Sequence, residues 1–138
     1  MFNEHGEFKV TLHNDILLAV VAGAWNAETA NAYRDTILGI ITPLKGNPWG
    51  LISNVNDWEL CTPDCELLMG KLLAECRAQG LKREAVVNNN IKSVKMELFH
   101  KHAHKNTLGS ASDEFLRCFF ETDAEAKYWL NTQGYGLK

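Results

Sequence analysis

The residues with the greatest chemical potential are three histidines and two cysteines, and neither group has the spacing of a standard reactive site. The run His100-Lys-His-Ala-His104 suggests a metal site. On a helix, however, His100 and His104 share one face, while His102 points away from it. No cysteine or carboxylate follows at a typical ligand spacing. We therefore interpret the run as a solvated helix end, where imidazoles suit the negative pole of the helix dipole, and we expect no metal.

Cys61 and Cys65 are four positions apart, whereas redox motifs use the spacing Cys-x-x-Cys. Cys65 is expected in the first turn of a helix, where free amide groups would stabilise a thiolate, although a small packed side chain is the commoner role. The sequence contains no glycine-rich phosphate loop and no Gly-x-Ser-x-Gly nucleophile elbow. We therefore expect neither a cofactor nor catalytic activity.

Any site would have to be positioned by strands that alternate with helices. Five segments have the apolar pattern of strands, and they cover residues 8–12, 16–22, 49–56, 82–88 and 114–120. The first two form a hairpin, in which the alternating first arm is an edge strand and the fully apolar second arm is buried. Residues 57–61 are interpreted as a polar turn after the third strand.

Capping residues and apolar side chains at three- to four-residue spacing predict four main helices. These helices follow Asn26, follow Thr62, span residues 91–102 and follow Thr122. The last helix begins with the capping box Thr122-Asp-Ala-Glu125. We expect Trp129 and Leu130 in this helix to be buried against the sheet.

The order β-β-α-β-α-β-α-β-α predicts a single α/β domain over residues 1–138, with a mostly parallel five-stranded sheet and one antiparallel N-terminal hairpin strand.

The last four strands are each followed by a helix, so their carboxyl ends share one edge of the sheet. Open α/β sheets bind ligands outside that edge. The side chains expected there, which we name the carboxyl-edge surface, are Trp25, Asn26, Asp57, Trp58, Cys61, Thr62, Asn88, Asn89, Asn90 and Thr122.

The carboxyl-edge surface has two interpretations. Two tryptophans among amides and hydroxyls, next to helix N-termini, are suited to recognition. Alternatively, the amides and hydroxyls only cap helices, and Trp25 and Trp58 each fill an end of the core.

Composition is that of an ordinary globular protein, with 46% hydrophobic and 22% charged residues. A net charge of −3 without a basic cluster argues against nucleic acid as a partner. The start of the sequence has neither the basic residues nor the apolar run of a signal peptide. The longest apolar run, residues 16–22, is too short to span a bilayer. We therefore expect a cytoplasmic protein whose four cysteines are reduced thiols.

Several stretches resemble the SpoIIAA-like branch of STAS-type domains. They are Gly6-x-Phe8, Gly23-Ala-Trp-Asn26, residues 49–58, and the ending Phe119-Phe-Glu-Thr-Asp-Ala-Glu-Ala-Lys-Tyr-Trp-Leu130. The resemblance covers nearly the whole chain. It implies a small α/β domain related to bacterial anti-sigma-factor antagonists and, more remotely, to lipid-carrying Sec14-like domains.

The better-known antagonists are switched by phosphorylation of a hydroxyl at the start of the helix after the third strand. The resemblance places Thr62 at that position. The family's Asp-Ser-(Ser/Thr)-Gly run is replaced here by Asp57-Trp-Glu-Leu-Cys-Thr-Pro. We therefore predict that Thr62 is a structural cap and is not phosphorylated.

Our leading interpretation is a non-catalytic STAS-like regulatory or interaction module, which binds a protein partner through the carboxyl-edge loops and the helix after Thr62. The alternative is a carrier or sensor of a small apolar or amphipathic ligand, held in a pocket near Trp25 and Trp58. An apolar cavity beneath the tryptophans would favour the carrier, whereas a filled core with an exposed apolar patch would favour the partner. A homodimer is compatible with either.

Overall fold

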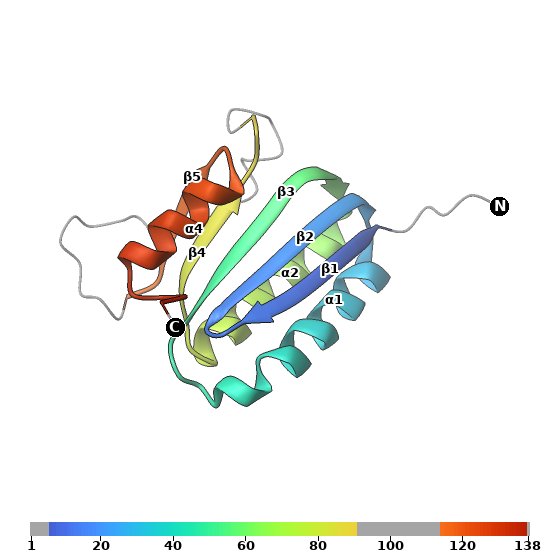
Figure 1. Ribbon diagram of the computed structural model, residues 1–138. Coiled ribbons are helices and arrows are strands. Elements are labelled where there is room, and N and C mark those ends of the chain that lie inside the picture. Colours follow the sequence, from blue (N-terminus) through green and yellow to red (C-terminus); the bar gives the residue numbers. More distant parts are fainter. Residues whose placement is uncertain (1–5, 91–113, 138) are drawn as a thin grey trace.

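The computed structural model describes residues 6–90 and 114–137, which form a five-stranded sheet with helices on both faces (Figure 1). In chain order the described elements are β1 (Glu7–His13), β2 (Ile16–Trp25), α1 (Ala27–Ile40), the short 3₁₀ helix η1 (Thr42–Leu44), β3 (Trp49–Cys61), α2 (Pro63–Ala78), β4 (Leu81–Val87), β5 (Leu116–Phe120) and α4 (Asp123–Thr132).

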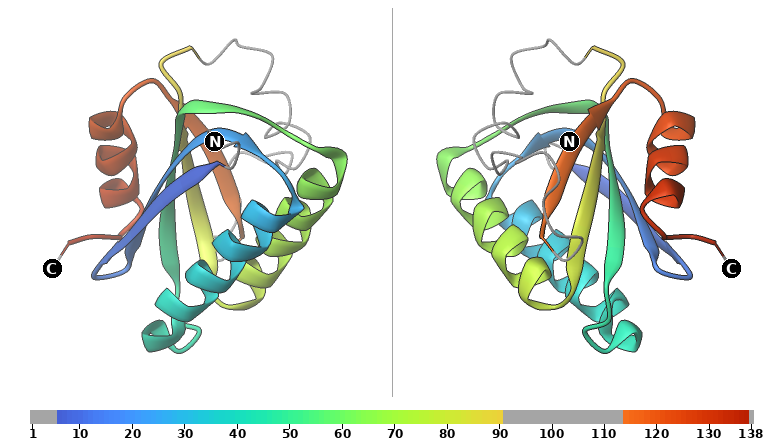
Figure 2. Two further views of the ribbon diagram at one scale, coloured as in Figure 1. Left: turned by 90° about the vertical axis from the view of Figure 1, so that its right-hand side faces the viewer. Right: turned by 90° about the vertical axis from the view of Figure 1, so that its left-hand side faces the viewer.

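The strands lie in the sheet in the same order as in the sequence, β1-β2-β3-β4-β5. β1 is antiparallel to β2, and the other neighbouring pairs are parallel. Right-handed crossovers between successive parallel strands place their helices on one face, so α1 and α2 lie side by side there. α4 follows the last strand and covers the opposite face (Figure 2). The predicted α/β fold with its mostly parallel sheet and antiparallel hairpin strand is thereby confirmed.

β3 is longer than predicted, because residues 57–61 continue the strand as far as Cys61 and do not form a polar turn. The reason is its partner. β2 continues to Trp25 and pairs with this part of β3, with Ala22 opposite Asp57 and Trp25 opposite Cys61. Shifts in register in this part of the ladder accommodate the irregular, polar sequence. Pairing between strands therefore overrides the local polarity of residues 57–61.

The described ranges contain three α-helices where four were predicted. The expected helix over residues 91–102 lies outside these ranges, as does the histidine run from His100 to His104. The three described helices begin where their caps predicted.

Two apolar clusters hold the sheet between its helices. The larger cluster lies under α1 and α2 and includes the fully buried Leu17, Ile37 and Trp49. The smaller one lies under α4 and is centred on Leu130, which is 0% exposed. Burial of Leu130 is confirmed. Trp129 is only half-buried and packs at a tilt on Phe120, so its predicted burial is correct only in part.

Candidate functional site

The two tryptophans of the carboxyl-edge surface are part of the core. Trp25 is 2% exposed and Trp58 is 3% exposed, and their rings meet edge to face with centroids 6.2 Å apart. Tyr33 from α1 contacts Trp25 in the same manner, with ring centroids 5.0 Å apart. The tryptophans therefore close one end of the apolar cluster under α1 and α2, as the second interpretation of the sequence stated.

The amides and hydroxyls of the same surface mainly cap helices. The Asn26 side chain accepts a hydrogen bond from the backbone amide of Thr29 at 3.0 Å, and Thr62 Oγ1 accepts one from Cys65 at 3.3 Å. Thr122 and Glu125 form the predicted capping box. These contacts satisfy amide groups that have no partner within the helix, so they account for the residues without invoking a ligand.

The remaining predicted site residues are divided between surface and interior. Asp57 and Asn89 are exposed, whereas Asn88 is 1% exposed. The backbone amide of Asn89 donates to Asn56 Oδ1 at 2.6 Å, which ties the end of β4 to β3. The structure thus places Asn88 and Asn89 near the ends of adjacent strands but does not bring them together with the tryptophan rings as one exposed surface.

Cys61 and Cys65 lie next to each other at the junction of β3 and α2. Burial raises the pKa of the Cys61 thiol. Burial, followed by a hydrogen bond to Cys61, raises the pKa of the Cys65 thiol. Both effects oppose the expected stabilisation of a thiolate by the helix N-terminus, so Cys65 is a packed thiol and not an activated nucleophile.

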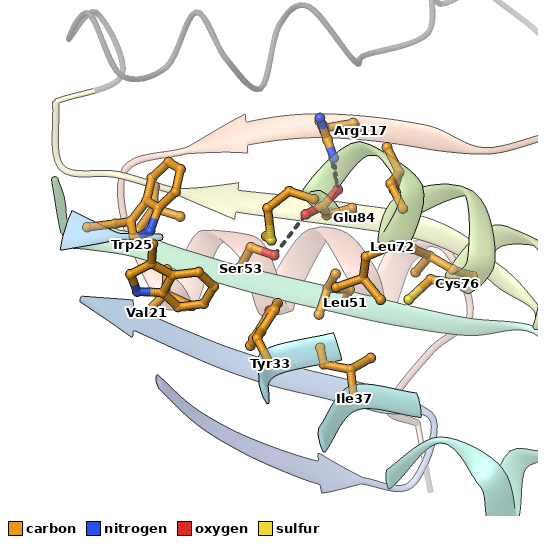
Figure 3. A pocket seen from close by; sticks show the side chains of 15 residues that line it. Val21, Trp25, Tyr33, Ile37, Leu51, Ser53, Leu72, Cys76, Glu84 and Arg117 are labelled. Carbon is orange, nitrogen blue, oxygen red and sulfur yellow. Dashed lines mark hydrogen bonds and ion pairs between the residues drawn. The ribbon is translucent and has the colours of Figure 1, made fainter. Parts of the chain in front are cut away.

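A cavity of about 70 Å³ lies in the larger cluster, between the sheet and helices α1 and α2 (Figure 3). Most of its lining is apolar and comes from β2, β3 and the two helices. Trp25 and Trp58 both line it. Trp25 and Trp58, predicted as site residues from the sequence, therefore border this cavity.

One wall of this cavity is polar. Ser53 Oγ on β3 donates a hydrogen bond to Glu84 Oε2 on β4 at 2.8 Å. Arg117 on β5 donates from Nε to Glu84 Oε1 at 2.7 Å, and its Nη2 atom lies 2.6 Å from the same oxygen. The side chains of Arg117 and Glu84 are only 6% and 4% exposed. A buried charge is tolerated when it is paired and hydrogen-bonded, and Glu84 meets both conditions.

The charge of Glu84 affects other groups that line the cavity. Burial raises the pKa of the Tyr33 hydroxyl, and the negative charge of Glu84 raises it further. The same two causes, in the same order, raise the pKa of the Cys76 thiol to about 12. Both groups therefore remain protonated at neutral pH.

Four residues that line the cavity were not predicted as site residues from the sequence, namely Tyr33, Ser53, Glu84 and Arg117. A signal was present, because Glu84 is a carboxylate in a parallel strand that must be covered on both faces, and such a carboxylate requires a buried cation. Arg117 in the neighbouring predicted strand was the obvious candidate. The strand register that sets Glu84 opposite Arg117 could not be read from the sequence.

Within residues 6–90 and 114–137, no group of three or more His, Cys, Asp or Glu side chains is arranged to hold a metal ion. No helix in that part of the chain is long and apolar enough to cross a membrane. All four cysteines are free thiols.

No protein-family model matches the sequence, and no curated protein matches it significantly. Several solved structures are similar in fold, including the following two. One is an uncharacterized protein of the DUF3478 family with a SpoIIAA-like fold from Shewanella loihica PV-4, which is 17% identical, with a TM-score of 0.66 over 94% of this chain and 97% of that chain. The other is the murine anion transporter Slc26a9, which is 10% identical, with a TM-score of 0.58 over 94% of this chain and 22% of that chain. At these identities the similarity establishes the fold alone.

Proposed function

From the premise of a SpoIIAA-like fold, we propose that this chain is a non-catalytic module that binds a small apolar or amphipathic ligand in the cavity beneath Trp25 and Trp58. The cavity is the observation that carries the proposal. A space of about 70 Å³ with an apolar lining and a polar wall is the arrangement expected of a ligand site.

The size of the cavity limits the ligand. One water molecule needs roughly 10–15 Å³ of such a space, and an engineered apolar cavity of roughly 150 Å³ holds benzene. A cavity of about 70 Å³ therefore accepts a group smaller than benzene. A larger amphipath would have to leave its remainder outside or move α1 and α2 away from the sheet.

Native mass spectrometry of the freshly purified protein tests this function. We expect a species heavier than the bare chain that loses its extra mass on denaturation. Leu72→Phe should abolish this species, because Leu72 lines the cavity and the larger ring would occupy it. Leu130→Phe makes the same change in the core under α4 and should retain the bound mass. If the wild type carries no extra mass, or both variants retain it, the ligand site is not this cavity.

A second function, the binding of a protein partner, is favoured by two exposed leucines near the carboxyl-edge surface. Leu60 is 63% exposed and Leu67 is 70% exposed, and they lie on either side of Thr62 in the sequence. Leu60 lies at the end of β3 and Leu67 in the first half of α2, so together they offer an exposed apolar contact for a partner. The partner could be another protein or a second copy of this chain.

Cross-linking in a lysate of the native host, followed by mass spectrometry, tests the second function. The double variant Leu60→Ser with Leu67→Ser should lose the cross-linked partner. Tyr128→Ser, which removes an exposed aromatic ring from α4, is the control and should keep it. Sedimentation velocity on the same three proteins separates a homodimer from a different partner.

We also propose a cytoplasmic location, which the four free thiols support.

A further inference from the structure

The polar wall of the cavity offers a specific set of hydrogen-bonding atoms. Ser53 has one hydroxyl proton, and it is already donated to Glu84 Oε2 at 2.8 Å. Toward the cavity Ser53 therefore offers only the lone pairs of its oxygen, which accept hydrogen bonds. A ligand group next to Ser53 has to be a donor.

Tyr33 approaches the same space from the other side. It is 4% exposed, it lines the cavity, and it points from α1 toward the strand that carries Ser53 (Figure 3). A ligand atom that accepts a hydrogen bond from the Tyr33 hydroxyl would use its donor capacity.

Charge further restricts the ligand group. Glu84 and Arg117 both line the cavity and are paired with each other, so neither offers an uncompensated charge to a ligand. A ligand carboxylate would lose its hydration, while the Arg117 guanidinium is already bound to Glu84. A ligand ammonium would lose its hydration, while both Glu84 oxygens are already bound by Ser53 and Arg117. A neutral group avoids both penalties.

Resting on the function proposed above, we propose that the cavity selects a neutral alcohol, whose hydroxyl donates to Ser53 Oγ and accepts from the Tyr33 hydroxyl. Its short alkyl part lies against the apolar lining, on the side of Trp25 and Trp58. A hydroxyl is a single group that is both donor and acceptor without charge, and it therefore complements this pair of side chains.

The test titrates the full chain with ethanol, acetate and ethylammonium, followed by two-dimensional ¹H–¹⁵N NMR. Each probe has two carbon atoms and is smaller than benzene, and the three differ in the head group. We expect ethanol to bind at least ~10-fold more tightly than either ion, because burial of an unpaired charge is strongly unfavourable. Tyr33→Phe keeps the aromatic ring and removes the hydroxyl, and should weaken ethanol binding by about 3- to 10-fold.

Tyr135→Phe is the matched control, because Tyr135 is buried in the core under α4, and it should leave the affinity unchanged. Acetate binding as tightly as ethanol, or an unchanged affinity in Tyr33→Phe, overturns the selectivity for alcohols and leaves the ligand site intact. If none of the three probes shifts the resonances of cavity-lining residues, both the selectivity and the proposed function fail. If Leu72→Phe binds ethanol as the wild type does, the probe is outside the cavity and the inference is also overturned.

Discussion

Glu84 and Arg117 face each other across β4 and β5, and their side chains form an ion pair inside an otherwise apolar cluster, with Arg117 Nη2 2.6 Å from Glu84 Oε1. Ser53 extends this pair to a third strand. Ser53 and Glu84 lie on the inner strands β3 and β4, and Arg117 reaches Glu84 from the edge strand β5. Their position explains how a cavity in this core can have one polar wall without destabilising the protein.

Removal of one partner of this pair should be strongly destabilising. Arg117→Met leaves the Glu84 carboxylate buried without its cation, and we expect a loss of about 3–5 kcal/mol in the free energy of unfolding. The double variant Glu84→Leu with Arg117→Met removes both charges and should lose much less. Urea denaturation measures both. Equal losses in the single and double variants would show that the ion pair is not the source of the effect.

An exposed ion pair provides the comparison with the buried pair of Glu84 and Arg117. Arg34 on α1 pairs with Glu75 on α2, with Arg34 Nη2 2.7 Å from Glu75 Oε2. Both side chains are more than a third exposed, so water screens their attraction. Arg34→Met should therefore have a far smaller effect on urea denaturation than Arg117→Met.

Variants in helix α4 compare how much the N-terminal cap and the buried side chains each contribute to the free energy of unfolding. Thr122→Ala removes the capping box and should cost about 1 kcal/mol. Leu130→Ala opens a cavity at a fully buried position and should cost about 2–5 kcal/mol. Trp129→Ala should cost less than Leu130→Ala, because the Trp129 ring is only half-buried. Urea denaturation that ranks Trp129→Ala above Leu130→Ala would contradict this packing.

Thr62 should not be phosphorylated. Its hydroxyl oxygen caps α2 through the amide of Cys65, and two acidic residues, Asp64 and Glu66, occupy the first turn. A phosphate would add roughly two negative charges beside these carboxylates. Intact-mass analysis of protein from the native host, purified with phosphatase inhibitors, should show no phosphorylated species. A substantial phosphorylated fraction that maps to Thr62 would restore the switch of the better-known antagonists.

Stability should fall in alkaline solution because of Cys76. Its pKa is raised in the folded protein to about 12, from 9.0 in an unperturbed thiol, chiefly by burial. The unfolded chain therefore loses this proton first, and the contribution of Cys76 to stability is complete below about pH 9 and decreases progressively up to about pH 12. Urea denaturation at pH 8 and pH 10.5 should show the loss.

Cys76→Ala is the matched variant for this measurement. It should be less stable than the wild type at pH 8, because a buried side chain is shortened. Its further loss between pH 8 and pH 10.5 should be smaller than that of the wild type, although other buried thiols such as Cys65 contribute in the same direction. An identical alkaline loss in both proteins would assign the effect to groups other than Cys76.

The helix starts and the order of the elements were determined by the sequence alone. Asn26, Thr62 and Thr122 cap their helices through hydrogen bonds to residues three positions away, so the information is local. The alternation of strand and helix patterns then limited the topology to a parallel sheet with a hairpin, because right-handed crossovers leave few other arrangements.

Only the tertiary structure decided where the cavity lies and what faces it. β3 continues through residues 57–61 because β2 pairs with it, and this pairing turns Trp58 into the core. Ser53, Glu84 and Arg117 are separated by 31 and 33 residues in the sequence and meet through the strand register. Register depends on the packing of the whole sheet, so a pattern read along one segment contains no information about which side chain lies opposite.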